Sequence, residues 1–208
     1  MYNMKKFLTL LVAIAAAAAA SAQTPEEILS RMENEMNKHE NDGISMIIDV
    51  KMPIIGTVST TTYFLGDNTK MEANVQGHQV LTWIDKTSQW IYNSEKNEVE
   101  ITRLKSPSSA ESDVEMFSGI AEGYDLSISK ETEKAWYISC KKSKSNTNKD
   151  DPKTMEVAVY KSNYYPMSLS AKASGVTMTL RNVKFGVSAK QVTFNPEDYP
   201  GVTIIEKR

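Results

Sequence analysis

Cysteine and histidine are scarce in this chain of 208 residues, which has one cysteine, Cys140, and two histidines, His39 and His78. A single cysteine excludes an internal disulfide, and these few side chains leave little material for a zinc site, a Cys–His nucleophile or haem. An excess of one charge is also lacking, because 24 lysines and arginines stand against 26 aspartates and glutamates. The resulting net charge of -2 argues against a nucleic-acid binder, which presents a strongly basic face.

Catalytic motifs are missing as well. The sequence contains no G-x-S-x-G, H-E-x-x-H or C-x-x-C pattern. The S-x-x-K pattern occurs at 127–130 and 139–142, but both copies fall in predicted strands, where serines facing water are the simpler interpretation. Asp150 and Asp151 lack the spacing of a calcium loop. We therefore predict a protein that is not an enzyme, has no catalytic or metal site and needs no cofactor, with both histidines solvated.

Residues 1–22 have the pattern of a secretory signal peptide. Lys5 and Lys6 precede an apolar run over 7–20, which is too short to span a bilayer comfortably, and Ala20-Ser21-Ala22 supplies the small residues that a signal peptidase reads. We expect cleavage after Ala22 and export of residues 23–208 to the periplasm as one soluble domain. An uncleaved membrane anchor is the alternative. No cysteine stands at the cleavage point, so the acylation of a bacterial lipoprotein is not expected.

One helix is predicted to open the domain. Thr24 is a capping residue, Pro25 suits the first helical position, and Glu27 completes a capping box. Apolar residues then recur at helical spacing as Ile28, Leu29, Met32 and Met36, before Gly43 ends the segment.

Strands follow, recognised by alternating apolar and polar residues between short polar turns. They are predicted over 44–52, 57–65, 70–75, 79–84, 89–93, 98–104, 124–130, 135–142, 154–161, 167–173, 176–185 and near 191–194. A helical pattern over 108–120 interrupts them, and 141–153 reads as an exposed loop. The chain lacks alternating strands and helices, so we predict a mainly β fold with a long antiparallel sheet that curls or closes.

Methionine is the unusual component of the apolar positions. Nine of the eleven methionines fall after residue 22, several of them on predicted apolar strand faces. Methionine is flexible and polarizable, and it is frequent where a surface accepts varied apolar shapes. It also fills ordinary cores, and periodicity alone does not distinguish a filled barrel from a hollow one. Cys140 shares a strand face with Trp136 and Ile138, so we predict a buried structural thiol.

The order of these pieces resembles the LolA-type periplasmic carriers of outer-membrane lipoproteins. Residues 80–93, with Trp83, Asp85, Trp90 and Tyr92, are similar to the family's apolar strand, turn and Trp-x-Tyr stretch, although Lys86 replaces the usual glycine of the turn. Residues 189–208, with Val192-Thr193-Phe194-Asn195-Pro196 and Pro200-Gly201-Val202-Thr203, are similar to its C-terminal ending. Tyr164-Tyr165-Pro166 fits a later hairpin. The resemblance covers essentially all of residues 23–208.

This resemblance implies a fold of the LolA/LolB type: a half-open, strongly curved antiparallel β-barrel of about 11 strands, with an N-terminal helix and a helical lid. We expect acyl chains to bind in an apolar cavity lined by Met46, Ile48, Met52, Phe64, Met71, Trp83, Trp90, Trp136, Met155, Met167 and Met178. The lid would carry Met116, Phe117 and Ile120. The stretch 65–70 contains no arginine to match the one that holds the family's lid, so we carry over no latch residue.

The implied function is a carrier, acting as a monomer, that shields the acyl chains of lipoproteins on their way to the outer membrane. Its partners would be an inner-membrane lipoprotein-releasing transporter and an outer-membrane acceptor. Two alternatives stay open on the same fold: a carrier of a different lipid, and an envelope sensor or protein-interaction module with a filled core.

Overall fold

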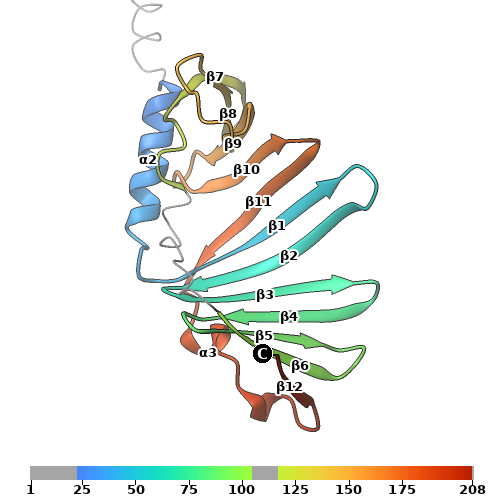
Figure 1. The fold of residues 1–208 in the computed structure, drawn as a ribbon. Helices are drawn as coiled ribbons and strands as arrows, with labels where there is room; N and C mark the ends of the chain where they lie inside the picture. Colours follow the sequence, from blue (N-terminus) through green and yellow to red (C-terminus); the bar gives the residue numbers. More distant parts are fainter. Residues whose placement is uncertain (1–22, 105–116, 208) are drawn as a thin grey trace, which may run out of the picture.

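The computed structural model describes residues 23–104 and 117–207 (Figure 1). The predicted signal peptide lies outside these residues. The first described element is helix α2 (Pro25–Asn37), and it begins as the sequence predicts. The Glu27 backbone N–H donates to Thr24 Oγ1, and the Thr24 N–H donates to Glu27 Oε2, each at a distance of 3.2 Å. This capping box satisfies backbone donors that the first turn of a helix leaves free.

Twelve strands form a single sheet in the order β12-β6-β5-β4-β3-β2-β1-β11-β10-β9-β8-β7. Their bounds are β1 (Ile44–Met52), β2 (Gly56–Leu65), β3 (Asn68–Val75), β4 (His78–Ile84), β5 (Ser88–Asn93), β6 (Glu98–Arg103), β7 (Tyr124–Glu131), β8 (Ala135–Lys142), β9 (Thr154–Tyr160), β10 (Pro166–Ala173), β11 (Val176–Phe185) and β12 (Thr203–Lys207). All neighbours are antiparallel except β12, which lies parallel to β6. The prediction of a mainly β, curved and open antiparallel sheet is confirmed.

The sheet has two distinct faces because side chains alternate along each strand. We call the face that α2 covers the inner face and the opposite one the outer face. On β1, Ile44, Met46 and Ile48 belong to the inner face, since they pack in or against the same core as α2. The cross-strand pairs then carry this assignment to the other strands. Met46 pairs with Thr62, and Thr62 with Met71, so Met71 also lies on the inner face.

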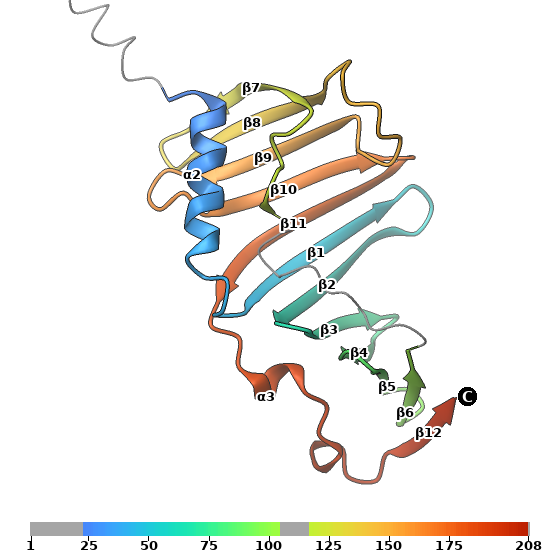
Figure 2. The same ribbon diagram turned by 60° about the vertical axis from the view of Figure 1, so that its left-hand side comes forward.

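The first core lies between α2 and the β7–β11 side of the sheet (Figure 2). The four apolar residues of the helix are all at most 3% exposed. They pack with buried residues of the strands, namely Ile44, Met46, Ile138, Cys140, Val157, Val159, Leu169 and Leu180. The helix therefore covers this part of the sheet over a buried apolar core.

The second core lies on the outer face of β4 and β5, where the C-terminal segment crosses the sheet. This segment contains α3 (Ala189–Val192) and the short 3-10 helix η2 (Pro196–Asp198). Phe194 contacts Trp83 and Trp90, with ring centroids 5.2 and 6.1 Å apart, and the Tyr199 ring lies 5.6 Å from that of Trp83. The segment then runs on to pair β12 with β6 (Figure 1).

The predictions for the end of the chain and for the lid region need correction. Residues 191–194 are not a strand: Ser188 and Gln191 form a capping box, and a helical turn results. The last strand instead covers 203–207. Residues 108–116 of the predicted helix lie outside the described residues, and 117–123 contain no α-helix. Within residues 23–104 and 117–207, no helix is both long and apolar enough to cross a membrane.

Candidate lipid-binding surface

Next to the core beneath α2, the inner face carries a further set of apolar side chains that are only partly buried, with Thr60 and Thr82 between some of them. We call this set the open apolar surface. It comprises Ile48, Val50, Met52, Val58, Met71, Ala73, Val80, Ile84, Ile91, Ala171, Val176 and Met178. Of the described helices, α2 has its main contacts with β7 and β9. Helix α3 contacts β2 and β3, where its Gln191 lines a pocket with the outer-face residues Thr61 and Tyr63. Met178 is 43% exposed, between Val50 and Ala171 on the neighbouring strands.

Several residues predicted to line a cavity do lie on the inner face, in two groups. Ile48, Met52, Met71 and Met178 belong to the open apolar surface. Met46, Phe64, Trp136 and Met155 lie in or against the core beneath α2. Met46 is only 1% exposed, so it supports the helix rather than facing open space. Their role in binding lipid stays a prediction.

The structure does not bring Trp83, Trp90 and Met167 together with these residues. Trp83 pairs with Lys70 and Trp90, all on the outer face, and both indoles pack against Phe194. Trp83 and Trp90 therefore lie on the opposite face of the sheet from Met46 and Met71. Met167 lies at an irregularity in β10 between Pro166 and Ser168, which turns its side chain to the outer face. There its sulfur accepts a hydrogen bond from the Tyr137 hydroxyl at 3.9 Å.

The described lid residues contact α2. Phe117 is 1% exposed, Ile120 is partly buried, and both pack against the core of the helix. A small cavity of about 80 Å³ lies between them and Leu29 and Met32 of α2. Met116 lies outside the described residues. Whether this segment acts as a lid remains a prediction.

Sequence reasoning missed much of the open apolar surface, notably Val50, Val80 and Ile91. The alternation within each strand was visible in the sequence. The missing information was the register of the neighbouring strands, which decides which alternate set shares a face with Met46. The turn lengths could have supplied part of it: the two-residue turns Gly66-Asp67 and Gln76-Gly77 connect strands whose ends pair directly.

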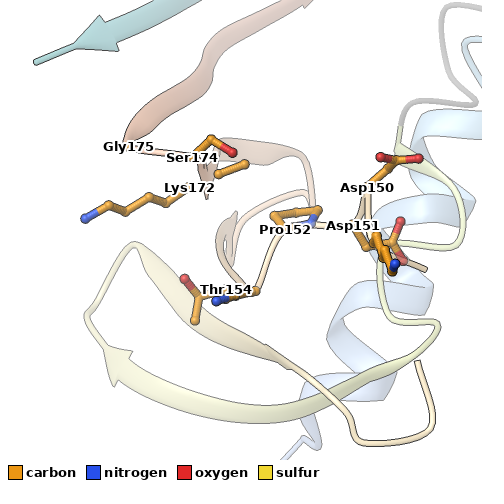
Figure 3. A pocket seen from close by; sticks show the side chains of 10 residues that line it. Asp150, Asp151, Pro152, Thr154, Lys172, Ser174 and Gly175 are labelled. Carbon is orange, nitrogen blue, oxygen red and sulfur yellow. The ribbon is translucent and has the colours of Figure 1, made fainter. Parts of the chain in front are cut away.

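A larger cavity, of about 560 Å³, lies at the ends of strands β10 and β11, where the 143–153 loop meets the turn between them (Figure 3). Its lining is mainly polar or charged and includes Asp150, Asp151, Lys172 and Ser174. Asn146 and Asn148 donate to the Asp151 carboxylate at 2.8 and 2.7 Å, so this carboxylate is engaged by its own loop. The charged residues around this cavity distinguish it from the open apolar surface.

The cysteine and the histidines show no catalytic arrangement in the described chain. Cys140 is fully buried, and burial raises the pKa of its thiol to about 11. The thiol is therefore protonated at neutral pH and is not a reactive nucleophile. His39 differs from the prediction, because it stacks on Phe185 with ring centroids 4.0 Å apart and contacts Asp42 and Tyr165 through its two nitrogens. Among the described residues, no group of three or more histidines, cysteines or acids could hold a metal ion.

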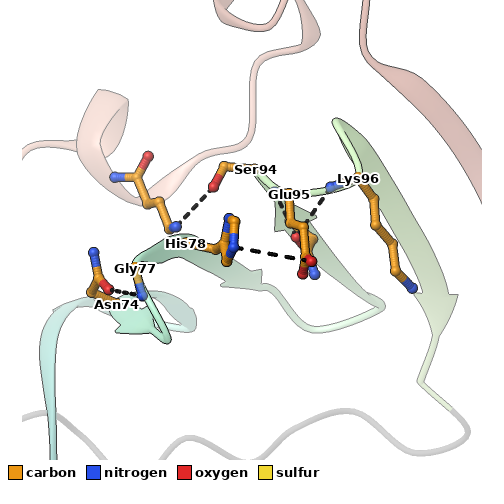
Figure 4. Close-up of polar contacts among 8 residues, drawn as sticks. Asn74, Gly77, His78, Ser94, Glu95 and Lys96 are labelled. Carbon is orange, nitrogen blue, oxygen red and sulfur yellow. Dashed lines mark hydrogen bonds and ion pairs between the residues drawn. The ribbon is translucent and has the colours of Figure 1, made fainter.

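His78 stands at the β3–β4 turn, beside the β5–β6 turn (Figure 4). Its side chain is 44% exposed, and Nε2 lies 4.0 Å from Glu95 Oε1. The neighbouring bonds hold the turns: Gly77 N–H donates to Asn74 Oδ1 at 3.0 Å, and Gln79 N–H donates to Ser94 Oγ at 2.8 Å. The prediction of a solvated histidine is confirmed here.

Comparisons with known proteins give a likeness of fold. No protein-family model matches the sequence, and no curated protein matches it. Among solved structures, LprF from Mycobacterium bovis has a TM-score of 0.51 at 6% identity, covering 84% of this chain and 99% of LprF. The lipoprotein LppX from Mycobacterium tuberculosis has a TM-score of 0.48 at 9% identity, covering 80% of this chain and 98% of LppX.

A LolA superfamily protein from Nitrosomonas europaea is also among the similar solved structures. It has a TM-score of 0.32 at 12% identity, covering 85% of this chain and 100% of that protein. The match to LprF carries the structural conclusion: over 84% of its length, this chain shares the fold of LprF.

Proposed function

We propose that this protein is an exported carrier that shields the acyl chains of lipoproteins, or of another lipid, and conveys them to the outer membrane. The observation that supports this most is the open apolar surface. Its partly buried apolar side chains share the inner face with the buried core beneath α2. Contiguous exposed apolar patches in soluble proteins mark interaction sites.

The energetics of acyl chains suit such a surface. Each buried methylene group contributes roughly 0.8 kcal/mol, so a chain of about 15 methylenes exposed to water costs on the order of 12 kcal/mol. A bound chain would cover residues such as Ile48, Met71 and Met178, which are partly exposed to water. Transfer between binding partners requires no bond to be made or broken. The function therefore needs no catalytic residue, in keeping with the lack of a catalytic motif in the sequence.

The two parts of the inner face would have different tasks. The core beneath α2 fixes the curvature of the sheet, and the open apolar surface receives the ligand. Phe117 and Ile120, held against α2, would mark where the lid segment joins this frame. The inner-membrane transporter and the outer-membrane acceptor implied by the family resemblance belong to the same proposal.

A fluorescent fatty-acid probe tests the proposal. We expect saturable binding by the wild-type protein and at least a tenfold loss of affinity in Met178→Glu, because a carboxylate would have to be desolvated by the bound chain. Thr177→Glu is the matched control. Thr177 is the neighbouring residue on β11, faces the outer side and pairs with Lys51 and Lys172, so affinity should not change.

Two results would contradict the proposal: no saturable uptake by the wild-type protein, or equal losses in the two variants. Circular dichroism of both variants shows that they are folded. Mass spectrometry of acylated species bound to the protein purified from the periplasm would then identify the cargo.

A further inference from the structure

The turn between β1 and β2 exposes two large apolar side chains. Ile54 is 97% exposed and Ile55 is 70% exposed, within the sequence Pro53-Ile54-Ile55-Gly56. Hairpin turns are usually built from glycine, asparagine, aspartate and serine, which suit both the backbone and water. The folding of this chain gains nothing from the Ile54 side chain, which packs against almost nothing.

A neighbouring turn lies beside it. The β10–β11 turn contains Ser174 and Gly175, and a Cβ built on Gly175 would lie 3.9 Å from Pro53 Cγ. Figure 1 shows that the β1–β2 and β10–β11 turns lie at the same end of their strands. Figure 3 shows Lys172 extending from the β10–β11 hairpin. Lys51 and Lys172 are both exposed, and no acidic residue occurs in 50–58 or 171–178. The two hairpin ends thus present apolar, lysine and small hydroxyl side chains and no carboxylate, while Asp150 and Asp151 of the 143–153 loop lie beside the β10–β11 turn.

The exposed tip is continuous with the open apolar surface. Met52 is the last residue of β1 and lies on the inner face. Val50, two residues earlier in the strand, lies on the same face. Val50 pairs with Met178, which is itself 43% exposed. An apolar path therefore runs from Ile54 at the edge of the sheet to the surface on which we propose that acyl chains bind.

From these features we infer that the β1–β2 turn docks the protein on anionic lipid bilayers, with Ile54 and Ile55 entering the interface and Lys51 and Lys172 contacting acidic headgroups. A lipid surface fits better than a protein partner, because two side chains on a convex turn offer far less than the roughly 800 Å² per partner of a stable protein interface. Lysines beside an apolar anchor match an anionic membrane. The inference extends the proposed function by placing the start of the apolar path at the bilayer.

Vesicle co-sedimentation tests the docking. The protein is exported to the periplasm of an expression host and purified, and its first residue is determined by mass spectrometry so that no uncleaved apolar segment contributes. Binding is measured to phosphatidylcholine vesicles with and without phosphatidylglycerol. We expect the anionic vesicles to bind more tightly, and Ile54→Ser/Ile55→Ser to weaken this binding at least tenfold.

The control is Ile204→Ser/Ile205→Ser on β12, where the side chains are 49% and 36% exposed but lie away from the turn. This variant should bind like the wild-type protein. Lys51→Ala/Lys172→Ala should lower the affinity for anionic vesicles about tenfold at low salt and much less at high salt. In a separate Ile54→Trp variant, the new indole should show a blue-shifted emission and quenching by brominated lipid.

Three results would overturn the inference: no preference of the wild-type protein for anionic vesicles, equal binding by the Ile54→Ser/Ile55→Ser variant, or a wild-type dimer in light scattering that this variant abolishes. The last result would assign the turn to self-association. Binding of the fatty-acid probe is measured on the same variants and should not change, since neither isoleucine belongs to the open apolar surface. Failure of membrane docking is thus distinguishable from failure of the proposed lipid binding.

Discussion

The two ends of the sheet bury their apolar side chains on opposite faces. At the β7–β9 end, residues such as Ile138 and Val157 lie on the inner face beneath α2. At the β4–β6 end, Trp83 and Val99 are buried on the outer face, with the C-terminal segment packed around Trp83. A sheet stabilised in this way does not need to bury the inner face of β4 and β5. That face is therefore available for a ligand without loss of the fold.

The buried face of the sheet changes from the inner to the outer one around β2 and β3. Here the Lys70 side chain lies near the rings of Tyr63 and Trp83. The Lys70 ammonium group lies 5.4 Å from the Trp83 ring centroid and 5.9 Å from that of Tyr63. Lys70 Nζ also lies 2.6 Å from Glu72 Oε1 and forms an ion pair with it. The charged outer face of β3 thus joins the aromatic outer core. Substitutions at either end of the sheet should therefore have different consequences for stability and for lipid binding.

The largest loss of stability is expected for Trp83→Ala. Trp83 is 3% exposed and contacts both Phe194 and Tyr199, so its removal should lower the free energy of unfolding by about 3–5 kcal/mol. Urea unfolding followed by circular dichroism measures this loss. The milder Trp83→Phe should leave affinity for the fatty-acid probe unchanged, because the side chain lies on the outer face. Reduced affinity in a folded Trp83→Phe protein would place this residue in the lipid site after all.

A pair of isoleucines compares the two ends directly on the inner face. Ile138 is fully buried beneath α2, so Ile138→Ala should cost about 3 kcal/mol. Ile91 lies on the open apolar surface between Thr82 and Glu100 and is only partly buried, so Ile91→Ala should cost about 1 kcal/mol or less. Urea unfolding of both variants checks the difference. Equal costs would mean that the open apolar surface is a filled core.

Much of the fold follows from local sequence signals. Thr24, Pro25 and Glu27 predict the start of α2, and alternation between polar turns predicts most of the strands within a residue or two. The final strand is not predicted by the sequence because β12 is short, exposed along its length and paired in parallel with a strand about a hundred residues earlier. Nothing local specifies such a pairing.

The candidate site was less predictable, for a physical reason. Alternation shows that Trp83 and Met71 each lie on an apolar stripe, but only the register across β2–β4 shows that the stripes face opposite sides. A buried aromatic in a strand was therefore assigned to the lipid cavity, although Phe194 covers it from outside. Met167 escaped for a related reason, since an irregularity in β10 reverses its direction.

Gly43 lies between the core beneath α2 and the start of the C-terminal segment. A substitution there should therefore disturb the packing of both. Its φ is +65°, and a Cβ would lie 2.8 Å from the Phe64 carbonyl oxygen and 2.9 Å from Val187 Cβ. Phe64 packs against the core beneath α2, and Val187 begins the C-terminal segment. Gly43→Ala should lower the free energy of unfolding by about 2 kcal/mol through backbone strain and crowding. Gly66→Ala is the control for backbone strain alone, because open space surrounds that position and the loss should be smaller.

The smallest effect is expected on the outer face of β1 and β11, where Asp49 pairs with Arg181, whose side chain is 45% exposed. Arg181 Nε donates to Asp49 Oδ2 at 2.6 Å, and Ser59 Oγ donates to Oδ1 at 2.5 Å. Asp49→Asn should lower the melting temperature by only about 1–2 °C at pH 7, because exposed ion pairs contribute little. A loss as large as that of Gly43→Ala would mean that this face is part of a core.

The pH dependence of this small effect has a definite sign. The hydrogen bond from Arg181 lowers the pKa of Asp49 below its ordinary value of 3.8. A carboxyl group with a lowered pKa in the folded state stabilises the protein above its unfolded pKa, and this contribution disappears as the pH falls through the folded pKa. The difference in melting temperature between the wild-type protein and Asp49→Asn should therefore be constant from pH 7 to about 5 and shrink below about pH 4. Arg181→Gln should remove the same dependence, and a difference that grows in acid would contradict the role of this pair.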